Sequence, residues 1–251
     1  MNEPNAALDG KWVLVTGAGR RIGAAIAQRL HTEGANIVVH YRSSDEPAEH
    51  LADVLNGARP DSAITIGGDL LATLRLPDMI SQIISQTSRL DAVINNASSF
   101  YPTPLGTITE EHWDDLMGTN LKAPLFLSQA AAPYLKETAG TIVNLIDIHA
   151  TRPLRDHIVY GPAKAGLAML TRSLARDLAP DVRVNGVAPG TILWPDDGMS
   201  DQIKDDVLRQ IPMKRPGEPR DVADCVLYLL RDAHYVTGQI ISVDGGRSIG
   251  W

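Results

Sequence analysis

Short apolar segments alternate with helical segments along almost the whole chain, and this alternation constrains the fold more than any other feature. Short apolar strands that are each followed by a helix are typical of a parallel sheet covered on both faces. The longest helical segment covers residues 110–136, where Pro124 marks a kink or a helix start. Strand-like segments span residues 11–16, 36–41, 62–66, 91–95, 141–146, 182–187 and 239–243. These seven segments predict a single α/β domain with a doubly wound, seven-stranded parallel sheet.

One stretch near the carboxyl end breaks this alternation. Residues 190–219 are rich in proline and glycine and carry only a weak helical pattern, over residues 201–210. Irregular segments of this length in a compact domain are more often functional than idle. The segment follows the sixth strand, so it is predicted to lie at the carboxyl edge of the sheet, where open α/β folds bind ligands. We interpret it as a substrate lid within one domain that covers residues 1–251.

The composition restricts the class of partner. The net charge of −7 argues against nucleic acid or an anionic membrane. The single cysteine, Cys225, excludes an internal disulfide and fits a reducing compartment. Neither a secretion signal nor an apolar stretch of membrane-spanning length is visible. The sequence predicts a cytoplasmic protein that acts on a small molecule.

A glycine-rich turn, residues 16–23, links the first strand to the first helix. Glycines let the backbone approach a pyrophosphate closely, and the helix N-terminus supplies oriented N–H donors and the positive end of its dipole. Such a turn also occurs as a purely structural loop, but its place between a strand and a helix favours a dinucleotide site of Rossmann type. The candidate cofactor residues in this turn are Gly17, Gly19, Arg21, Ile22 and Gly23.

The second strand ends without an acidic residue before Asp45. An acidic side chain at this point holds the ribose hydroxyls of NAD, and it would repel a 2′-phosphate. The Arg42 guanidinium instead matches phosphate geometry with paired donors, although an arginine at a strand end is also compatible with simple solvation. We predict NADP(H) as the cofactor, held here by His40, Tyr41, Arg42 and Ser43.

Two further turns are predicted at the same edge, after the third and fourth strands. The first contains an aspartate that is also a common helix cap, and the second an asparagine pair that is also common in structural turns. Their occurrence together with the glycine-rich turn favours the cofactor interpretation. The candidates are Asp69, Leu70, Asn96, Ala97 and Ser98.

Tyr160 and Lys164 are four residues apart on a predicted helix, so their side chains share one face. A nearby ammonium favours the phenolate, which is expected to lower the pKa of the tyrosine and make it a usable acid at neutral pH. A Tyr-x-x-x-Lys pattern taken alone is usually a solvated helix face. Its position after the fifth strand, at the predicted ligand edge, favours a catalytic pair.

Asp147 ends the fifth strand, thirteen residues before Tyr160. An aspartate at a strand end is by default a helix cap or a surface residue. A carboxylate beside a tyrosine can also carry a proton, or accept hydrogen bonds from N–H groups. We interpret Asp147 as the third member of the catalytic set, with a preference for a nitrogen-rich ring over a simple ketone.

These motifs together resemble the short-chain dehydrogenase/reductase family over almost the whole chain. The turn is similar to the family's Thr-Gly-x-x-x-Gly-x-Gly pattern, with Arg21 where the second glycine is expected. The resemblance implies that Asp69 lies near the adenine and that Lys164 holds the nicotinamide ribose. It also implies that Asn120 supports a water-linked proton path to Lys164, although Asn120 is also compatible with a simple helix interruption. Tyr160, Lys164, Pro189 and Gly190 are added to the candidate cofactor residues by the same resemblance.

Within the family, the combination of Asp147, Tyr160 and Lys164 with Arg21 and the segments 40–43 and 96–105 resembles the pteridine reductases. The resemblance implies that an aromatic ring stacks the pterin against the nicotinamide, in agreement with the preference of flat rings for stacking. It also implies an NADPH-dependent homotetramer in which the C-terminal region, ending at Trp251, reaches a neighbour's pocket. The candidate substrate residues are Ser98, Phe100, Asp147, Tyr160 and Trp194.

Several alternatives stay open at this stage. Phe100 is compatible with a core side chain under a loop, and Trp194 with a surface anchor. The activity expected is reduction of dihydropterins to tetrahydropterins, and whether oxidised pterins and folates are also reduced is open. A dihydromonapterin or dihydrofolate reductase shares the same catalytic set. A carbonyl or acyl-carrier reductase fits Asp147 less well, and a non-catalytic NADP(H) sensor would not require the proton path.

Overall fold

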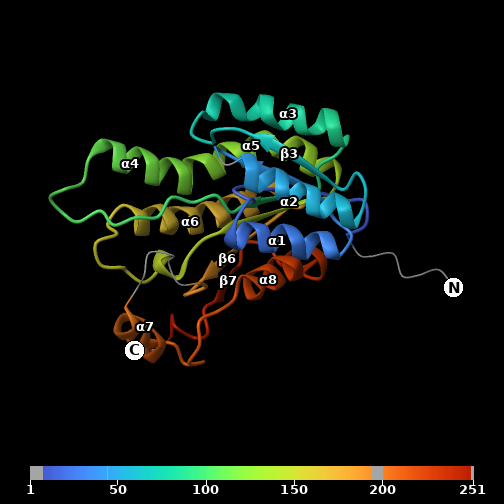
Figure 1. The fold of residues 1–251 in the computed structure, drawn as a ribbon. Helices are drawn as coiled ribbons and strands as arrows, with labels where there is room; N and C mark the ends of the chain where they lie inside the picture. The colour runs from blue at the N-terminus through green and yellow to red at the C-terminus, as the bar shows by residue number, and fades with distance from the viewer. Residues whose placement is uncertain (1–7, 44, 194–199, 250–251) are drawn as a thin grey trace.

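The computed structural model describes residues 8–43, 45–193 and 200–249 (Figure 1). One seven-stranded sheet runs through the molecule in the order β3-β2-β1-β4-β5-β6-β7, and every neighbouring pair is parallel. The predicted fold class is therefore confirmed. The strands are β1 (Trp12–Val15), β2 (Asn36–Tyr41), β3 (Ala63–Gly67), β4 (Ala92–Asn95), β5 (Thr141–Leu145), β6 (Arg183–Pro189) and β7 (Ile240–Val243).

Helices cover both faces of the sheet, as Figure 1 shows. One face packs against α1, α2 and α8, and the other against α3, α5 and α6. The helices are α1 (Arg21–Thr32), α2 (Asp45–Ala58), α3 (Leu76–Thr87), α4 (Glu110–Met117), α5 (Ala123–Glu137), α6 (Tyr160–Leu178), α7 (Asp201–Gln210) and α8 (Pro219–Arg231). In the described part of the chain, none of them is both long and apolar enough to cross a membrane.

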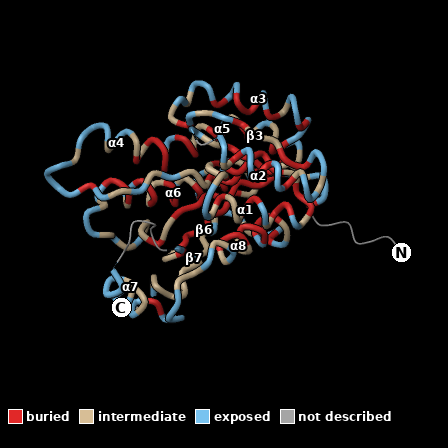
Figure 2. The backbone as a smooth tube through the Cα atoms, viewed as in Figure 1, coloured by how far each residue is buried: buried red, intermediate tan, exposed pale blue. Residues whose placement is uncertain are grey.

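Alternation along the strands builds the two cores. In β1, Val13 and Val15 join the cluster on the α1 side, while Leu14 joins the cluster on the α3 side. The same alternation places Ile37 on the first side and Val38 on the second. Figure 2 shows the buried residues concentrated along these strands, between the two helical layers. Because both faces are covered, the strands read as continuous apolar runs in the sequence.

The long segment predicted to be helical over 110–136 is divided into three parts. A π-helical turn, Gly118–Lys122, separates α4 from α5, and Pro124 stands in the first turn of α5. The proline was therefore correctly expected at a helix start, where its missing N–H costs no hydrogen bond. The π turn was not predicted, because no residue pattern distinguishes it from an ordinary helix. Such turns often occur at functional sites.

The order of strands reverses between β1 and β4. β1 pairs with β2 on one side and with β4 on the other, through Val13 opposite Ile37 and Ala92. The chain first builds outward from β1 to β3 and then restarts at β4 in the opposite direction. Open α/β sheets bind ligands outside the carboxyl ends of the strands at such a switch point. The topology therefore indicates a ligand site at the turns that follow β1 and β4.

Arg183 holds the end of α8 against the sheet. Its guanidinium donates hydrogen bonds to the carbonyl oxygens of Leu229 (2.8 Å), Leu230 (3.3 Å), Ala233 (3.0 Å) and Val236 (3.5 Å). Burial lowers the pKa of Arg183. The last carbonyls of a helix have no partner within the helix, so one side chain satisfies several of them at once.

We expect Arg183→Met to lower the free energy of unfolding by about 2–4 kcal/mol, because partly buried carbonyl groups lose their charged donor. The measurement is urea unfolding followed by circular dichroism. Arg172→Met, at an exposed position on α6, is the matched control and should change stability by less than about 0.5 kcal/mol. Equal effects in the two variants would contradict the role given to Arg183.

Candidate functional site

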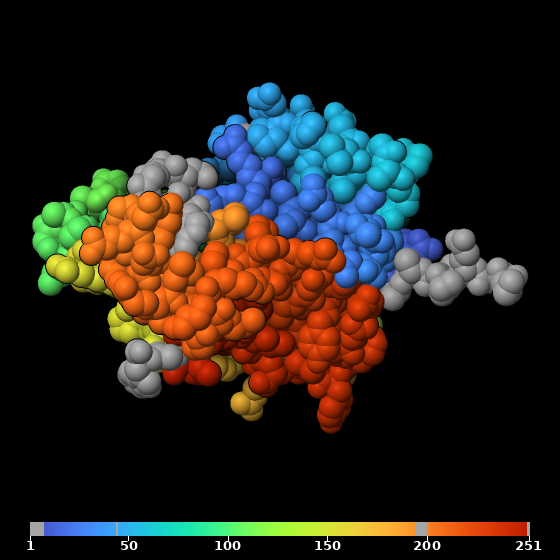
Figure 3. All heavy atoms as spheres, turned by 60° about the horizontal axis from the view of Figure 1, so that its bottom comes forward, coloured from blue at the N-terminus to red at the C-terminus, as the bar shows by residue number. Residues whose placement is uncertain are grey.

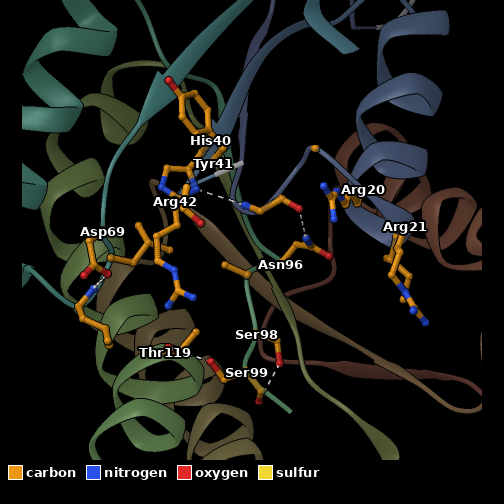
Figure 4. A pocket seen from close by; sticks show the side chains of 18 residues that line it. Arg20, Arg21, His40, Tyr41, Arg42, Asp69, Asn96, Ser98, Ser99 and Thr119 are labelled. Carbon is orange, nitrogen blue, oxygen red and sulfur yellow. Dashed lines mark hydrogen bonds between the residues drawn. The ribbon is translucent and has the colours of Figure 1, made fainter. Parts of the chain in front are cut away.

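A cleft of about 480 Å³ opens at the carboxyl ends of β1, β2 and β4 (Figure 4). The cleft therefore lies at the switch point of the sheet. Four of its lining residues were not predicted from the sequence: Arg20, Leu71, Ser99 and Thr119. The predicted cofactor residues that line it are Gly17, Gly19, Arg21, Ile22, Gly23, His40, Tyr41, Arg42, Ser43, Asp69, Leu70, Asn96, Ala97 and Ser98.

The glycine-rich turn has two positions that need glycine. Gly17 has φ of 60°, in the left-handed region that side chains disfavour. A Cβ on Gly23 would collide with the Gly17 carbonyl oxygen and would lie 2.6 Å from Asn96 Nδ2. The turn and the start of α1 can therefore pack closely only without side chains at these two positions. This packing keeps the first N–H groups of α1 at the wall of the cleft.

Arg21 also adopts a left-handed backbone, with φ of 52°. It stands where the family pattern has glycine, so the structure explains why glycine is usual there. A non-glycine residue in this region costs about 1 kcal/mol or more. Backbone strain that persists beside a ligand cleft is a reason to suspect a function for the side chain. We take the Arg21 guanidinium as a candidate phosphate ligand.

His40 supports the turn from beneath. Its ring is buried, Nδ1 accepts a hydrogen bond from the Gly17 N–H (3.2 Å), and Nε2 lies 3.0 Å from the Gly68 carbonyl oxygen. Nδ1 must carry a lone pair to accept, so Nε2 holds the proton and donates to Gly68. Burial lowers the pKa of His40 to about 4. His40 lines the cleft as expected, but both ring nitrogens are engaged by the backbone.

Asn96 connects β4 to the glycine-rich turn. Its Nδ2 donates to the carbonyl oxygens of Thr16 (2.8 Å) and Gly17 (3.1 Å). The Thr16 hydroxyl in return accepts from the N–H groups of Asn96 (2.9 Å) and Ala97 (3.0 Å). Asn96 therefore bonds the turn, as its alternative interpretation has it, and this bonding shapes the cleft, while its role as a cofactor residue stays a prediction.

Charged side chains stand on two sides of the cleft. In Figure 4, Arg42 extends from the end of β2 into the cleft, and Arg20 and Arg21 lie on the opposite side. Asp69 is turned toward its own backbone, where its Oδ1 accepts from the Leu71 N–H at 3.0 Å. Arginines around a glycine-rich helix start fit a ligand that carries several phosphates.

Asp147 and Tyr160 meet directly. The Tyr160 hydroxyl donates to Asp147 Oδ2 at 2.8 Å. The other carboxylate oxygen, Oδ1, accepts from the His149 N–H at 2.8 Å and begins the short 3₁₀ turn Ile148–Ala150. One oxygen therefore caps a helical turn while the other binds the tyrosine, and the catalytic role of Asp147 stays a prediction. The cap fixes the rotamer of the carboxylate and so aims it at Tyr160.

Burial, and not the charge of Lys164, has the largest effect on the pKa of Tyr160. Its pKa is raised, first by burial and then by the charge and hydrogen bond of Asp147, while Ser98 acts in the opposite direction. Lys164 donates to the Leu145 carbonyl oxygen at 2.9 Å, and its nitrogen lies 5.8 Å from the centre of the Tyr160 ring. Burial lowers the pKa of Lys164 to about 8. The expectation that the ammonium lowers the pKa of Tyr160 is therefore wrong here, and Tyr160 keeps its proton.

Asn120 lies in the π turn between α4 and α5 and is completely buried. Its Nδ2 donates to the carbonyl oxygens of Ser99 and Leu116, both at 2.9 Å. Its Oδ1 accepts from the Ser98 hydroxyl at 2.6 Å. Asn120 thus interrupts the helix and at the same time fixes the loop after β4. Its role in a proton path to Lys164 stays a prediction.

Phe100 packs against His157 and lies next to Tyr160. The two rings stack with centroids 4.7 Å apart and an angle of 21°, and Phe100 meets Tyr160 edge-on at 4.8 Å. Phe100 is 55% exposed, so it is not a core side chain under a loop. His157 was missed by the sequence analysis, because it lies in an irregular loop without a recognisable motif.

The remaining candidates lie away from the cofactor cleft or outside the described residues. Pro189 ends β6, and the Gly190 N–H donates to the Val243 carbonyl oxygen at 3.0 Å, but neither residue lines the cleft. Trp194 and Trp251 fall outside the described residues. Of the expected lid, α7 contains no buried residue, and it stands forward at one side of the molecule in Figure 3. Its action as a lid stays a proposal.

The domain is doubly wound, and its glycine-rich turn lies at the switch point of the sheet. A buried Tyr-x-x-x-Lys pair follows β5. Together these features define a class of dinucleotide-binding oxidoreductases. The sequence pattern of a family described as "Enoyl-(Acyl carrier protein) reductase" matches residues 17–248. The chain therefore belongs to the short-chain dehydrogenase/reductase family, and it is an oxidoreductase of that family.

Relatives with different names are similar to the chain over nearly its whole length. Pteridine reductase 1 of Leishmania tarentolae is 37% identical, over 94% of this chain and 96% of the relative. The 3-oxoacyl-acyl-carrier-protein reductase FabG of Staphylococcus aureus is 38% identical, over 94% and 97%. An uncharacterized oxidoreductase of Methylorubrum extorquens is 32% identical, over 95% and 98%. The alignment with the pteridine reductase spans 277 positions, more than the 251 residues of this chain, so that relative has insertions.

The depressed pKa of His40 predicts a loss of stability in acid. The unfolded chain takes up this proton near pH 6.5, whereas the folded protein takes it up only near pH 4. Stability is therefore complete above pH 6.5 and falls as the pH is lowered toward 4, by about 3 kcal/mol in total for this group. Between pH 7 and pH 4.5, urea unfolding should show a larger loss of stability for the wild-type protein than for His40→Asn. Equal losses in both proteins would contradict the assignment.

Arg21 allows backbone strain and ligand contact to be separated. We expect Arg21→Gly to be more stable than Arg21→Ala by about 1 kcal/mol, since only glycine relieves the left-handed strain. Both variants should bind NADP⁺ about tenfold more weakly than wild type, because both lose a charge-assisted phosphate contact. Thermal unfolding and fluorescence titration with NADP⁺ provide the two readouts. Wild-type affinity in either variant would exclude Arg21 as a phosphate ligand.

Proposed function

We propose that the protein is an NADPH-dependent pteridine reductase that converts dihydropterins to tetrahydropterins. The observation that carries this proposal is the hydrogen bond from the Tyr160 hydroxyl to the Asp147 carboxylate. It couples the expected acid to a group that accepts hydrogen bonds from N–H donors. A pterin presents such donors along its edge, whereas a ketone presents only oxygen.

Three side chains of the protein would have different roles in proton delivery. Tyr160 is the proton donor toward a ring nitrogen of an oxidised pterin, since its hydroxyl carries a proton and is held in a fixed direction by Asp147. For a dihydropterin, the family resemblance suggests water as the proton source. Asp147 orients the tyrosine hydroxyl and, with its charge, would stabilise the positive charge that protonation of a ring nitrogen places on the substrate. Lys164 supplies a compensating positive charge, buried beneath the pair.

The cleft supports NADPH as the cofactor, which when bound supplies the hydride. The start of α1 and the glycine-rich turn would hold the pyrophosphate. Arg42, with Arg21 on the opposite wall, would hold the 2′-phosphate or another phosphate group, and no acidic residue lies between Tyr41 and Asp45 to repel it. The expected aspartate of an NAD site is absent from the end of β2, so NADPH is favoured over NADH.

Phe100 supports a flat substrate. Its ring is more than half exposed, close to Tyr160, and attached to a loop that Asn120 fixes. A pterin stacked on this ring would present its edge to Asp147 and Tyr160. Ser98 would contact both ligands, since it lines the cofactor cleft and also affects Tyr160.

The competing function is reduction of a 3-oxoacyl group on an acyl carrier. This candidate is favoured by the similarity to the Staphylococcus aureus reductase, which aligns with fewer gaps than the pteridine reductase. Asp147 weighs against it, because a carboxylate repels the oxyanion that forms when a ketone is reduced. Dihydromonapterin or dihydrofolate as the physiological substrate is a variant of the main proposal. Comparison of kcat/KM for dihydrobiopterin, dihydromonapterin and dihydrofolate distinguishes these three substrates.

Assembly into a homotetramer in the cytoplasm is part of the proposal. Large apolar side chains are exposed on the helices that the family uses for subunit contacts, among them Trp113 on α4 and Met169 on α6. Clusters of exposed apolar surface favour a protein interface. Sedimentation of the purified protein measures the oligomeric state directly.

We expect Asp147→Ser to reduce kcat/KM for a dihydropterin by about 10²- to 10⁴-fold, the usual contribution of an aligned proton-transfer set. Affinity for NADPH should stay at the wild-type value, because Asp147 does not line the cofactor cleft. The readouts are NADPH oxidation with dihydrobiopterin and fluorescence titration with NADPH.

Asp114→Ser, at an exposed position on α4, is the matched control and should keep full activity. Unchanged dihydropterin turnover in Asp147→Ser would refute the proposed function. Faster reduction of an acetoacetyl thioester by Asp147→Ser than by wild type would support the view that the carboxylate selects against ketones.

A further inference from the structure

Three hydroxyl groups line one wall of the cofactor cleft. They belong to Ser98 and Ser99, in the loop after β4, and to Thr119, in the π turn. In Figure 4 these three side chains lie across the cleft from His40. We call them the hydroxyl wall. A hydroxyl carries one proton and two lone pairs, so the direction in which it donates decides what the wall can bind.

The hydroxyls of Ser99 and Thr119 donate to Asp115, a partly buried residue of α4. Asp115 Oδ1 accepts from Ser99 Oγ at 3.2 Å and from Thr119 Oγ1 at 3.4 Å. The two hydroxyl oxygens are also 3.4 Å apart, so Ser99 can donate to Thr119 instead. Because a carboxylate only accepts, both protons are used within this cluster in either arrangement.

The hydroxyl of Ser98 is engaged in the same sense. It donates to Asn120 Oδ1 at 2.6 Å. The Asn120 amide cannot be reversed, because its Nδ2 donates to the carbonyl oxygens of Ser99 and Leu116. Its oxygen therefore faces Ser98 and leaves the serine only the role of donor in this bond. All three hydroxyls thus keep only lone pairs for a ligand.

The loop that carries the two serines rests on α4. The Tyr101 ring meets the ring of His112 edge-on, with centroids 5.7 Å apart, and it packs against a buried cluster that contains Leu116. Thr119, on the other side of the cluster of hydroxyls, is itself buried. The helix that supplies Asp115 therefore also fixes the place of the hydroxyl wall.

Lone pairs without protons suit a ligand group that donates hydrogen bonds. Ionised phosphate oxygens only accept, and the side chains that suit them are the arginines elsewhere in the cleft, Arg20, Arg21 and Arg42. A nicotinamide dinucleotide carries two exocyclic N–H donors on its rings, the amino group of adenine and the carboxamide of nicotinamide. The cleft therefore combines cations for phosphates with an accepting wall for one of these two groups.

We infer that the hydroxyl wall recognises an N–H donor on a ring of the cofactor, and that Asp115 is the positioning residue that gives the wall this polarity. The inference rests on the proposed binding of a nicotinamide dinucleotide. Asp115 does not line the cleft, so it acts through Ser99 and Thr119. Without its carboxylate, their protons are free to turn toward the ligand, and the wall then donates as well as accepts.

Calorimetric titration of the full-length protein with three ligands tests the inference. The ligands are NADP⁺, its analogue with hypoxanthine in place of adenine, and its analogue with 3-acetylpyridine in place of nicotinamide. Each analogue lacks one of the two exocyclic amino groups. Wild type should bind one analogue about tenfold more weakly than NADP⁺, because an acceptor in the wall loses its partner. The analogue that binds weakly identifies the group that meets the wall.

The discrimination should depend on Asp115. In Asp115→Ala it should fall to about threefold or less, because the freed hydroxyl protons remove the requirement for a donor. Asp115→Glu keeps the carboxylate and should keep the discrimination. Asp114→Ala, at the exposed neighbouring position, is the matched control and should behave as wild type. Thr119→Val removes one acceptor at nearly constant shape and should also lower the discrimination, so it serves if Asp115→Ala fails to fold.

A purely structural role of Asp115 would weaken the binding of all three ligands equally. An unchanged ratio of affinities in Asp115→Ala and Thr119→Val would therefore overturn the inference, and so would equal affinities of wild type for all three ligands. Absence of dihydropterin reduction by wild type, with the expected ratios of affinities present, would refute only the proposed reaction. Absence of NADP⁺ binding would refute both the proposed cofactor and the inference.

Discussion

The hydrogen bond between Tyr160 and Asp147 is the interaction on which the account of this protein depends. It forms because β5 ends at Leu145, at the same edge where α6 begins with Tyr160. The 3₁₀ turn after β5 uses one oxygen of Asp147 as its cap and so aims the other at the tyrosine. A local feature of the backbone thus fixes the geometry of this pair. The glycine-rich turn and the π turn place the cofactor cleft and Ser98 beside this pair.

Burial sets the electrostatics of the pair. Tyr160 and Lys164 are both nearly inaccessible, so burial disfavours the charged form of each, and Asp147 strengthens this effect for the tyrosine while opposing it for the lysine. The site therefore holds a protonated tyrosine next to a carboxylate, with the buried Lys164 close by. Charges that are buried need such compensation, because desolvation disfavours an isolated one. The arrangement suits an acid that releases its proton only to a substrate atom.

Much of the fold could be predicted because it depends on local patterns. Apolar strands, a glycine-rich turn and Pro124 at a helix start are visible in the sequence, and parallel strands must bring their ends to one edge. The contacts of Asn120 and His157 could not be predicted, since each joins segments that lack a periodic pattern. The direction of the pKa shift of Tyr160 was also predicted wrongly, because the spacing of two residues on a helix does not show how deeply they are buried. Arg21 was noticed as an exception, but its left-handed backbone appears only in three dimensions.

We propose that the carboxylate of Asp147 selects a nitrogen-rich ring over a ketone. The measurement that tests it most directly is the ratio of kcat/KM values of the wild-type protein for dihydrobiopterin and for an acetoacetyl thioester, both with NADPH. A site that hydrogen-bonds to the polar groups of one substrate should strongly reject a substrate that lacks them. We therefore expect a ratio above about 100 in favour of the pterin. A ratio below one would contradict it and would favour reduction of an acyl-carrier substrate.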